Sequence, residues 1–307
     1  MLIPTLIRGY TMLDIAQIIT DRIISELEKG AAPWVKPWRT LKGMPGAGMP
    51  HNPLSGTHYR GINHLWLSML QGAYTTPYWV TLKQANKANA RIREGERGTP
   101  VVFWSVSKKD SKGANGETVT SAYAFIKHYH VYNIEQVEGL ILPEAPPAPV
   151  ADFDQSPAVM ALIDRLALSG GLTHAGDSAY FQPARDLIVM PPMAAFASAA
   201  NYHATLLHEA VHATGHESRL KRLTPARFGS DDYAYEELVA ELGAAMLCAH
   251  TGIDGDLRHA GYIESWLKAL KNDKKFILSA SGKAQAAMDF LTASKQVEVE
   301  QDEALAA

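Results

Sequence analysis

Hydrophobic and polar positions follow two different periods in the first half of this chain. Isoleucine and leucine recur every three or four residues over 14–29, which predicts an amphipathic helix. Residues 99–107 and 118–132 are rich in β-branched and aromatic residues, and the loop between them contains Asn115-Gly116. This pattern predicts a β-hairpin. Between the helix and the hairpin, Thr81 is a candidate N-cap of a second helix. Together these elements predict a small α+β domain.

The second half has a different pattern, in which apolar helices follow short strands. Residues 186–190 form the most apolar of these strands, directly before the segment that leads into a long helix. An edge strand there could accept an extended peptide by backbone pairing, and a core strand is the other interpretation. Helices are expected over 156–168, 201–216, 233–250, 257–272 and 282–292, and strands over 172–174, 179–182 and 186–190.

A Pro/Ala-rich segment separates the two halves, and 307 residues exceed what one core usually serves. We therefore predict an α+β protein of two domains. The predicted divisions are a first domain over 1–141, a linker over 142–152, a second domain over 153–295 and an acidic disordered tail over 296–307.

The most informative stretch is the helix predicted over 201–216, which contains the H-E-x-x-H pattern. In a helix, His208 and His212 lie one turn apart on the same face, so their imidazoles can bind one Zn²⁺. Glu209, one residue further on, can take the proton of a water activated by the metal as that water attacks a carbonyl. A helix with two ordinary histidines is the alternative.

A third ligand must come from elsewhere in the chain. Gly215 fits the longer H-E-x-x-H-x-x-G-x-x-H pattern, but position 218, where its third histidine would fall, is serine. The helix predicted over 233–250 carries Glu237 and Glu241 on a stripe of otherwise small residues, where a buried acid needs compensation. We predict Glu237 as the third ligand and Glu241 as a group that orients the first helix. Glu236 is interpreted as a solvated acid in the first helical turn, with ligation as the alternative.

The predicted metal is Zn²⁺, although a site of two histidines and one glutamate also accepts Mn²⁺ or Co²⁺. Such a site would make the chain a metallopeptidase. Tyr233 or Tyr235 is a candidate for stabilising the oxyanion of the reaction.

Cysteine content and apolar patterning bear on the compartment. Cys248 is the only cysteine, which excludes an intramolecular disulfide, fits a reducing compartment and is expected to be buried. Charges interrupt the apolar N-terminus, so neither a membrane span nor a signal peptide is predicted. The expected localisation is cytoplasmic.

Charge divides unequally between the halves. Residues 1–145 contain 16 Lys and Arg against 11 Asp and Glu, and the remainder contains 13 against 21. The basic half also holds many aromatic residues, and single-stranded nucleic-acid binding needs this combination, because bases stack on aromatic rings and cations follow the backbone. The other interpretation is that most of these aromatic residues form the core of a small domain. The DNA-binding candidates are Trp34, Lys36, Trp38, Arg39, Tyr59, Arg60, Tyr78, Trp79, Lys83, Arg97, Lys127 and Tyr129.

Several motifs follow one another in a fixed order along the chain. In the first half these are PWVKPW (33–38), YRGIN (59–63), YWVTLKQA (78–85), EGERGTPVVFW (94–104) and YHVYNIEQ (129–136). In the second half they are LHEAVHATGHESRLKR (207–222) and FGSDDYAYEELVAELGAAML (228–247). This series of motifs resembles the ArdC antirestriction family of conjugative plasmids, which is related to the N-terminal part of TraC-type primases.

The resemblance implies a domain that binds single-stranded DNA, followed by a zincin-like metallopeptidase domain. It also implies protection of incoming conjugative DNA from host restriction, with an unknown protein substrate. Two alternatives remain open. The metal site could be only structural in a DNA-binding protein, or the basic domain could recruit a protein partner to a peptidase.

Overall fold

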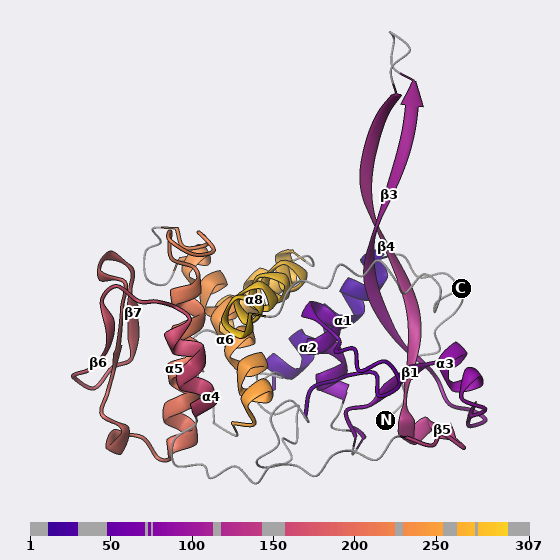
Figure 1. Cartoon of the computed structure of the whole chain (residues 1–307), viewed down its shortest axis with the longest axis horizontal. Helices are drawn as coiled ribbons and strands as arrows, with labels where there is room; N and C mark the ends of the chain where they lie inside the picture. The colour runs from indigo at the N-terminus through magenta and orange to yellow at the C-terminus, as the bar shows by residue number, and fades with distance from the viewer. Residues whose placement is uncertain are drawn as a thin grey trace.

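A computed structural model of the chain combines helices and strands, which confirms the predicted α+β class (Figure 1). The residues it describes are 12–29, 48–70, 73–74, 76–112, 118–142, 157–224, 230–253, 263–273 and 276–293. The first half contains α1 (Met12–Leu27), α2 (Gly61–Leu70), β1 (Trp79–Thr81), α3 (Leu82–Lys87), β2 (Arg91–Ile92), β3 (Thr99–Lys112), β4 (Thr118–Asn133) and β5 (Val137–Glu138). The second half contains α4 (Pro157–Asp164), β6 (Gly171–His174), β7 (Tyr180–Gln182), β8 (Leu187–Met190), α5 (Ala199–Thr214), α6 (Asp231–Thr251), α7 (Ile263–Asn272) and α8 (Phe276–Thr292).

The predicted hairpin is the most conspicuous element of the first half. Strands β3 and β4 pair antiparallel from Thr99 opposite Val131 to Lys112 opposite Thr118. The short strand β1 pairs only with the base of β4, and Figure 1 shows the rest of the ribbon projecting away from the body of the molecule. The hairpin prediction is confirmed, with a first strand longer than expected. The predicted turn at Asn115-Gly116 lies outside the described residues.

Helix α3 begins where the sequence predicted a cap. The Thr81 hydroxyl accepts a hydrogen bond from the backbone N–H of Gln84 at 3.2 Å, and the Gln84 side chain accepts one from the Thr81 N–H at 2.9 Å. This reciprocal capping box satisfies two N–H groups that the start of a helix would otherwise leave without acceptors. Trp79 and Val80, just before Thr81, belong to strand β1, so the helix begins only after the aromatic residues Tyr78 and Trp79.

The sheet of the second half corrects one expectation. Its strand order is β6-β8-β7, and all four residues of the central strand β8 are buried. A strand with neighbours on both sides has no free backbone edge for a peptide. The interpretation of residues 186–190 as a peptide-accepting edge is therefore wrong, and the core-strand interpretation holds.

Helix α2 of the first half packs against α8 of the second, and one hydrophobic cluster includes residues from both halves. At this contact the Gly61 N–H donates to Oε1 of Gln285 at 2.8 Å, and Arg60 forms an ion pair with Asp289. The two halves thus share apolar packing and polar contacts.

Three other expectations concern the remaining chain. Cys248 is buried, as predicted. None of the helices in the described ranges is long and apolar enough to cross a membrane. Residues 143–152 of the predicted linker and the whole predicted tail lie outside the described residues, so the domain boundaries stay predictions.

Candidate metal centre

Helix α5 places the two histidines of the H-E-x-x-H pattern side by side. The helix begins at the cap Ser198, whose hydroxyl accepts from the Asn201 N–H, and Gly215 ends it. His208 is 2% exposed, and its Nε2 lies 3.1 Å from Nε2 of His212. Both imidazoles therefore direct the same ring nitrogen toward one point.

Glu237 of α6 completes a group of three ligand-type side chains. Its carboxylate oxygens lie 3.5 Å from His208 Nε2 and 3.4 Å from His212 Nε2. Ligand atoms held tetrahedrally about 2.0–2.1 Å from one ion are separated by about 3.3 Å. The donor set and its spacing thus fit a divalent cation, and this is the one group of three or more such side chains found among the described residues.

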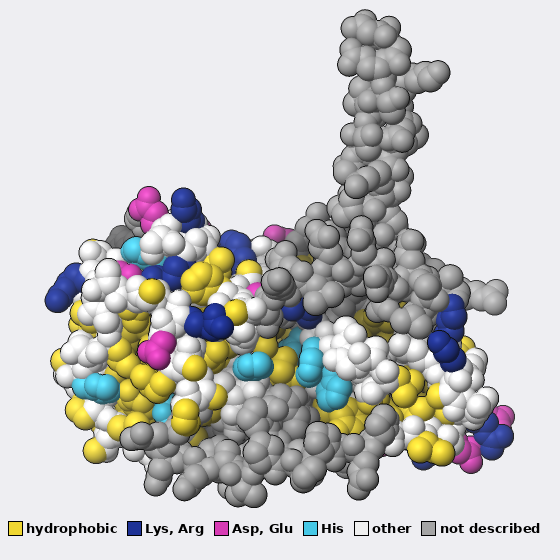
Figure 2. All heavy atoms as spheres, viewed as in Figure 1, with side chains coloured by type: hydrophobic (Ala, Val, Ile, Leu, Met, Phe, Trp, Pro, Cys, Tyr) yellow, Lys and Arg dark blue, Asp and Glu magenta, His cyan; other side chains and the backbone are white. Residues whose placement is uncertain are grey.

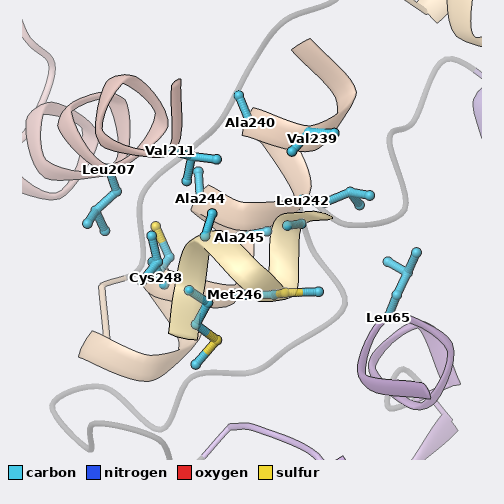
Figure 3. Packing of buried hydrophobic residues seen from close by; sticks show 14 of the residues in the cluster. Leu65, Leu207, Val211, Val239, Ala240, Leu242, Ala244, Ala245, Met246 and Cys248 are labelled. Atoms are coloured by element: carbon cyan, nitrogen blue, oxygen red, sulfur yellow. The ribbon is translucent and has the colours of Figure 1, made fainter. Parts of the chain in front are cut away.

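A close helix crossing brings Glu237 to the histidines. Small residues line α6 where it meets α5, and Figure 3 shows Val211 of α5 grouped with Ala240 and Ala244 of α6. At Gly243 an added Cβ would lie 2.8 Å from a methyl carbon of Val211. An added Cβ would force Val211 or the helices to shift, so glycine at 243 permits this close approach.

The structure also places Glu241 beside the first histidine. Its side chain is 1% exposed, and Oε1 lies 3.8 Å from Nδ1 of His208. This nitrogen is the one that faces away from Glu237. The arrangement matches the orienting role predicted for Glu241, which stays a prediction.

Glu236 is the clearest correction at this site. The sequence pattern predicts a solvated acid, but the side chain is 16% exposed and Oε1 lies 3.1 Å from Nδ1 of His212. Its carboxylate also accepts hydrogen bonds from Arg222, at 2.8 Å from Nε and 2.7 Å from Nη2. Burial would raise the pKa of Glu236, but the hydrogen bonds and charges of Arg222 and His212 outweigh it and lower this pKa.

Arg222 is a second residue that sequence reasoning missed. It lies in the loop after α5 and is 6% exposed at its side chain. Two features of the sequence could have indicated it: a basic side chain follows Gly215 closely, and the second ring nitrogen of a metal-binding His212 needs a hydrogen-bond partner.

The site attracts positive charge strongly. Burial would lower the pKa of His212, but hydrogen bonds to Glu236 and Glu237 and the nearby charge of Glu209 raise it to about 10. Burial would likewise raise the pKa of Glu237, and hydrogen bonds from His208 and His212 lower it well below its usual range. A bound divalent cation can take the place of the proton that these groups share.

The remaining catalytic candidates differ in position. Glu209 is 7% exposed, and its charge acts on His212. Tyr233 lies four residues before Glu237 and so on the same face of α6. Tyr235 is not brought to the histidines, because its hydroxyl lies 2.6 Å from Ser279 Oγ and its ring contacts Phe276 and Lys283.

Several DNA-binding candidates are buried or contact other residues of the protein. Trp79 is fully buried in strand β1, so its position does not support its predicted role as a base-stacking residue. Arg60 forms the ion pair with Asp289, which also argues against a role at phosphates. Tyr59 and Tyr129 are half-buried and pack against the core, and Tyr78 is half-buried with its ring against His51.

Other candidates keep the exposure that DNA contact requires. Lys83 and Arg97 are exposed. On the face shown in Figure 2, the described Lys and Arg side chains are dispersed and form no single patch. Trp34, Lys36, Trp38 and Arg39 lie outside the described residues, as does the side chain of Lys127.

Comparison with known proteins assigns each half to a family. Residues 13–132 match the model of the N-terminal domain of the anti-restriction factor ArdC, and residues 161–283 match that of zincin-like metallopeptidases. A solved structure of the metal-free antirestriction ArdC protein from plasmid R388 is 39% identical, with a TM-score of 0.74, and the match covers 91% of this chain and 97% of that one. The Mn(II)-bound structure of the same protein is 36% identical, with a TM-score of 0.71 over 92% of this chain and 98% of that one.

Relatives found by sequence fall into two groups. A DNA primase TraC of Escherichia coli is 38% identical over 92% of this chain, but the match spans only 27% of the primase. The match to a second TraC primase of Escherichia coli spans only 20% of that protein. The uncharacterized protein y4eC of Sinorhizobium fredii is 37% identical, over 93% of this chain and 94% of that protein. The motifs, the fold and the matches to the two domain models and to the ArdC structures agree: the chain belongs to the ArdC antirestriction family, with an ArdC-type N-terminal domain and a zincin-like C-terminal domain.

Proposed function

We propose that this protein binds single-stranded DNA through its N-terminal half and carries a metal-dependent peptidase-type site in its C-terminal half. Its role would be to protect incoming conjugative DNA from host restriction, with a protein of the restriction system as substrate. The observation that carries the proposal is the convergence of His208, His212 and Glu237, with Glu209 in the same buried site.

The proposed ligands are His208 and His212 through Nε2, and Glu237 through its carboxylate. A divalent ion bound there would polarise a peptide carbonyl and make water a better nucleophile at neutral pH. Two histidines and one glutamate favour Zn²⁺ and also accept Mn²⁺ or Co²⁺, and Mn(II) occurs in a solved ArdC structure. Three protein ligands leave room for a substrate, which is typical of catalytic sites.

The chain's own residues would supply the remaining chemistry. Glu209 would accept a proton from the attacking water and deliver it to the leaving amine. Glu241 would hold the ring of His208 from the opposite nitrogen. Tyr233, on the face of α6 that carries Glu237, is the remaining candidate for the oxyanion.

DNA binding rests on the ArdC-type domain, on the TraC relatives and on exposed cations such as Lys83 and Arg97. Phosphate contacts release counterions, so the affinity should fall steeply with salt. Fluorescence anisotropy with labelled single- and double-stranded oligonucleotides across a salt series tests this. A salt-sensitive preference for single strands supports the proposal, and negligible binding to both kinds of DNA contradicts it.

Peptidase chemistry is tested by Glu209→Gln, with Glu217→Gln as a control at an exposed acid just beyond the same helix. We expect the Glu209→Gln variant to bind metal normally and to cleave restriction-system proteins about 10²–10⁴-fold more slowly, since general-base catalysis contributes about that much. Cleavage at the wild-type rate would contradict the role of Glu209.

Burial of the site favours a second candidate function. His208, Glu209 and Glu237 are each at most 7% exposed, as in metal sites that only stiffen a fold. In that case the protein would protect DNA by binding it. Conjugative transfer into a restricting host separates the two functions, because undiminished protection by the Glu209→Gln variant would favour the structural role.

A further inference from the structure

We propose that Glu236 and Arg222 form a positioning pair that holds His212 in the ring orientation and tautomer needed for metal binding. The inference rests on the metal site proposed above and adds two residues that do not touch the metal. It also assigns different supporting acids to the two histidines, Glu236 to His212 and Glu241 to His208.

The geometry at His212 separates its two ring nitrogens. Nδ1 lies 3.1 Å from Oε1 of Glu236, whereas Nε2 lies 3.1 Å from Nε2 of His208 and 3.4 Å from Glu237. A neutral imidazole carries one proton and one lone pair on opposite nitrogens. A carboxylate that accepts a hydrogen bond from Nδ1 therefore leaves the lone pair on Nε2, directed at the cation.

Arg222 fixes Glu236 in that role. The guanidinium donates to both carboxylate oxygens, from Nε at 2.8 Å and from Nη2 at 2.7 Å. Such a bidentate pair restricts both the position and the plane of the carboxylate. Both side chains are largely buried, so the pair is poorly screened by solvent.

Arg222 also joins the carboxylate to the end of the helix that bears His212. Its Nη2 donates to the Val211 carbonyl at 2.7 Å, and its Nη1 donates to the Thr214 hydroxyl at 3.1 Å. Carbonyls in the last turn of a helix lack N–H partners within the helix, and the Val211 carbonyl accepts instead from the Thr214 hydroxyl at 2.6 Å and from Arg222. The guanidinium thereby bridges the last turn of α5 and Glu236 of α6.

Gly215 makes room for this arrangement. A Cβ at position 215 would lie 3.0 Å from Nη2 and 3.1 Å from Cζ of Arg222. The backbone returns close to the helix end, where the Arg222 N–H donates to the Gly215 carbonyl at 2.8 Å. The same Cβ would lie 2.9 Å from Cγ of Leu223, so the glycine that follows the histidine pattern is explained by the close return of Arg222 and Leu223 rather than by a third histidine.

Mn²⁺ affinity tests the positioning role, measured by calorimetry and by the electron paramagnetic resonance signal of free Mn²⁺. We expect Glu236→Gln to weaken Mn²⁺ binding about 10–100-fold, the range typical of groups that orient metal ligands. Asp232→Asn removes a charge from an exposed position in the first turn of the same helix and should leave the affinity unchanged.

A purely structural role predicts a different result. It would lower the thermal stability of the metal-free protein while leaving the Mn²⁺ affinity of the folded protein at the wild-type value, and that result would overturn the proposal. Wild-type protein that fails to bind Mn²⁺ would instead overturn the metal site itself. The double variant with Arg222→Gln should lose little more affinity than Glu236→Gln alone, because the two residues act through one contact.

A measurement on the unaltered protein covers the case in which these variants do not fold. Nitrogen-15 NMR of the Zn²⁺-loaded wild-type protein reports which ring nitrogen of His212 carries the proton. We expect the proton on Nδ1 and the metal on Nε2. Metal on Nδ1 would overturn the proposal.

Discussion

In the C-terminal half the residues of functional interest are buried and contact one another, whereas in the N-terminal half they are dispersed and several serve the fold instead. The ligand atoms of His208, His212 and Glu237 all lie within 4.8 Å of one another. In the N-terminal half, Trp79 is in the core and Arg60 is paired with Asp289. The comparison shows that a motif with helical spacing predicts how its side chains are placed relative to one another. A high content of aromatic and basic residues does not predict which of those side chains are exposed.

The two halves should therefore respond differently to substitution. Changes in the C-terminal half should alter metal binding and stability, because its polar groups are buried and coupled. Changes at exposed cations of the N-terminal half should alter DNA affinity with little effect on stability.

The largest effect is expected for Glu237→Ala, which removes one proposed ligand. We expect Mn²⁺ or Zn²⁺ binding to weaken about 100–1,000-fold. The binding free energy of a structural zinc site is about 10–16 kcal/mol, and the variant loses one of the three proposed protein ligands. Calorimetry measures this loss. DNA affinity should be retained, and an unchanged metal affinity would exclude Glu237 as a ligand.

The next effect concerns a buried ion pair outside the metal site. Asp186 accepts hydrogen bonds from Arg219 and from the Ser169 N–H, and both charged side chains are under 10% exposed. Asp186→Asn keeps a residue that tolerates its positive φ of 46° but leaves Arg219 without a countercharge. We expect a loss of about 3 kcal/mol in the free energy of unfolding at pH 7, measured with urea, and little change for the exposed Asp164→Asn.

This ion pair also predicts a pH dependence. Burial would raise the pKa of Asp186, but the hydrogen bonds and charge of Arg219 outweigh it and lower that pKa. A lowered pKa means that the stabilisation is present above the unfolded-state value of about 3.9 and is lost as the pH falls through the folded-state value. The stability difference between wild type and Asp186→Asn should therefore shrink below about pH 4. A constant difference would contradict this explanation.

A smaller effect is expected at the helix crossing. Gly243→Ala forces a Cβ against Val211 and should cost about 1–2 kcal/mol of unfolding free energy and weaken metal binding as the helices separate. Gly282→Ala in α8 is the matched control, because nothing lies within 4 Å of its added Cβ. That control should gain about 0.5–1 kcal/mol from helix propensity. Equal effects at both glycines would argue against the close approach.

The smallest effects are expected at exposed cations of the N-terminal half. Lys83→Ala and Arg97→Ala should each weaken binding to single-stranded DNA several-fold and reduce the slope of log affinity against log salt by about 1. Lys268→Ala, at an exposed position on α7, is the control. Equal losses for all three variants would indicate a general charge effect rather than a DNA-binding surface.

Much of the metal centre could be predicted from the sequence because helical spacing maps directly onto a face. His208 and His212 lie one turn apart, and the small residues around Glu237 indicated a face that another helix could approach. The same reasoning failed for Glu236, because a residue about 100° around the helix still reaches His212 when two helices cross closely. The contribution of Arg222 depends on the path of a loop, which periodicity does not describe.

Fold prediction succeeded and failed for similarly physical reasons. The hairpin and the capped helix α3 follow from local signals, namely β-branched runs and a Thr81 cap with Gln84 three residues later. The position of the strand 186–190 depends on which strands pair with it, and that information is not local. The burial of Trp79 likewise depends on the sheet formed with β4, far along the chain.

The central claim, that His208, His212 and Glu237 bind a divalent metal, is tested most directly by a crystal structure of the protein with Mn²⁺, using anomalous scattering at the manganese edge. We predict a single strong anomalous peak about 2.0–2.3 Å from Nε2 of both histidines and from the Glu237 carboxylate. A peak at other residues, or none at this group under conditions where the protein binds Mn²⁺, would contradict the claim.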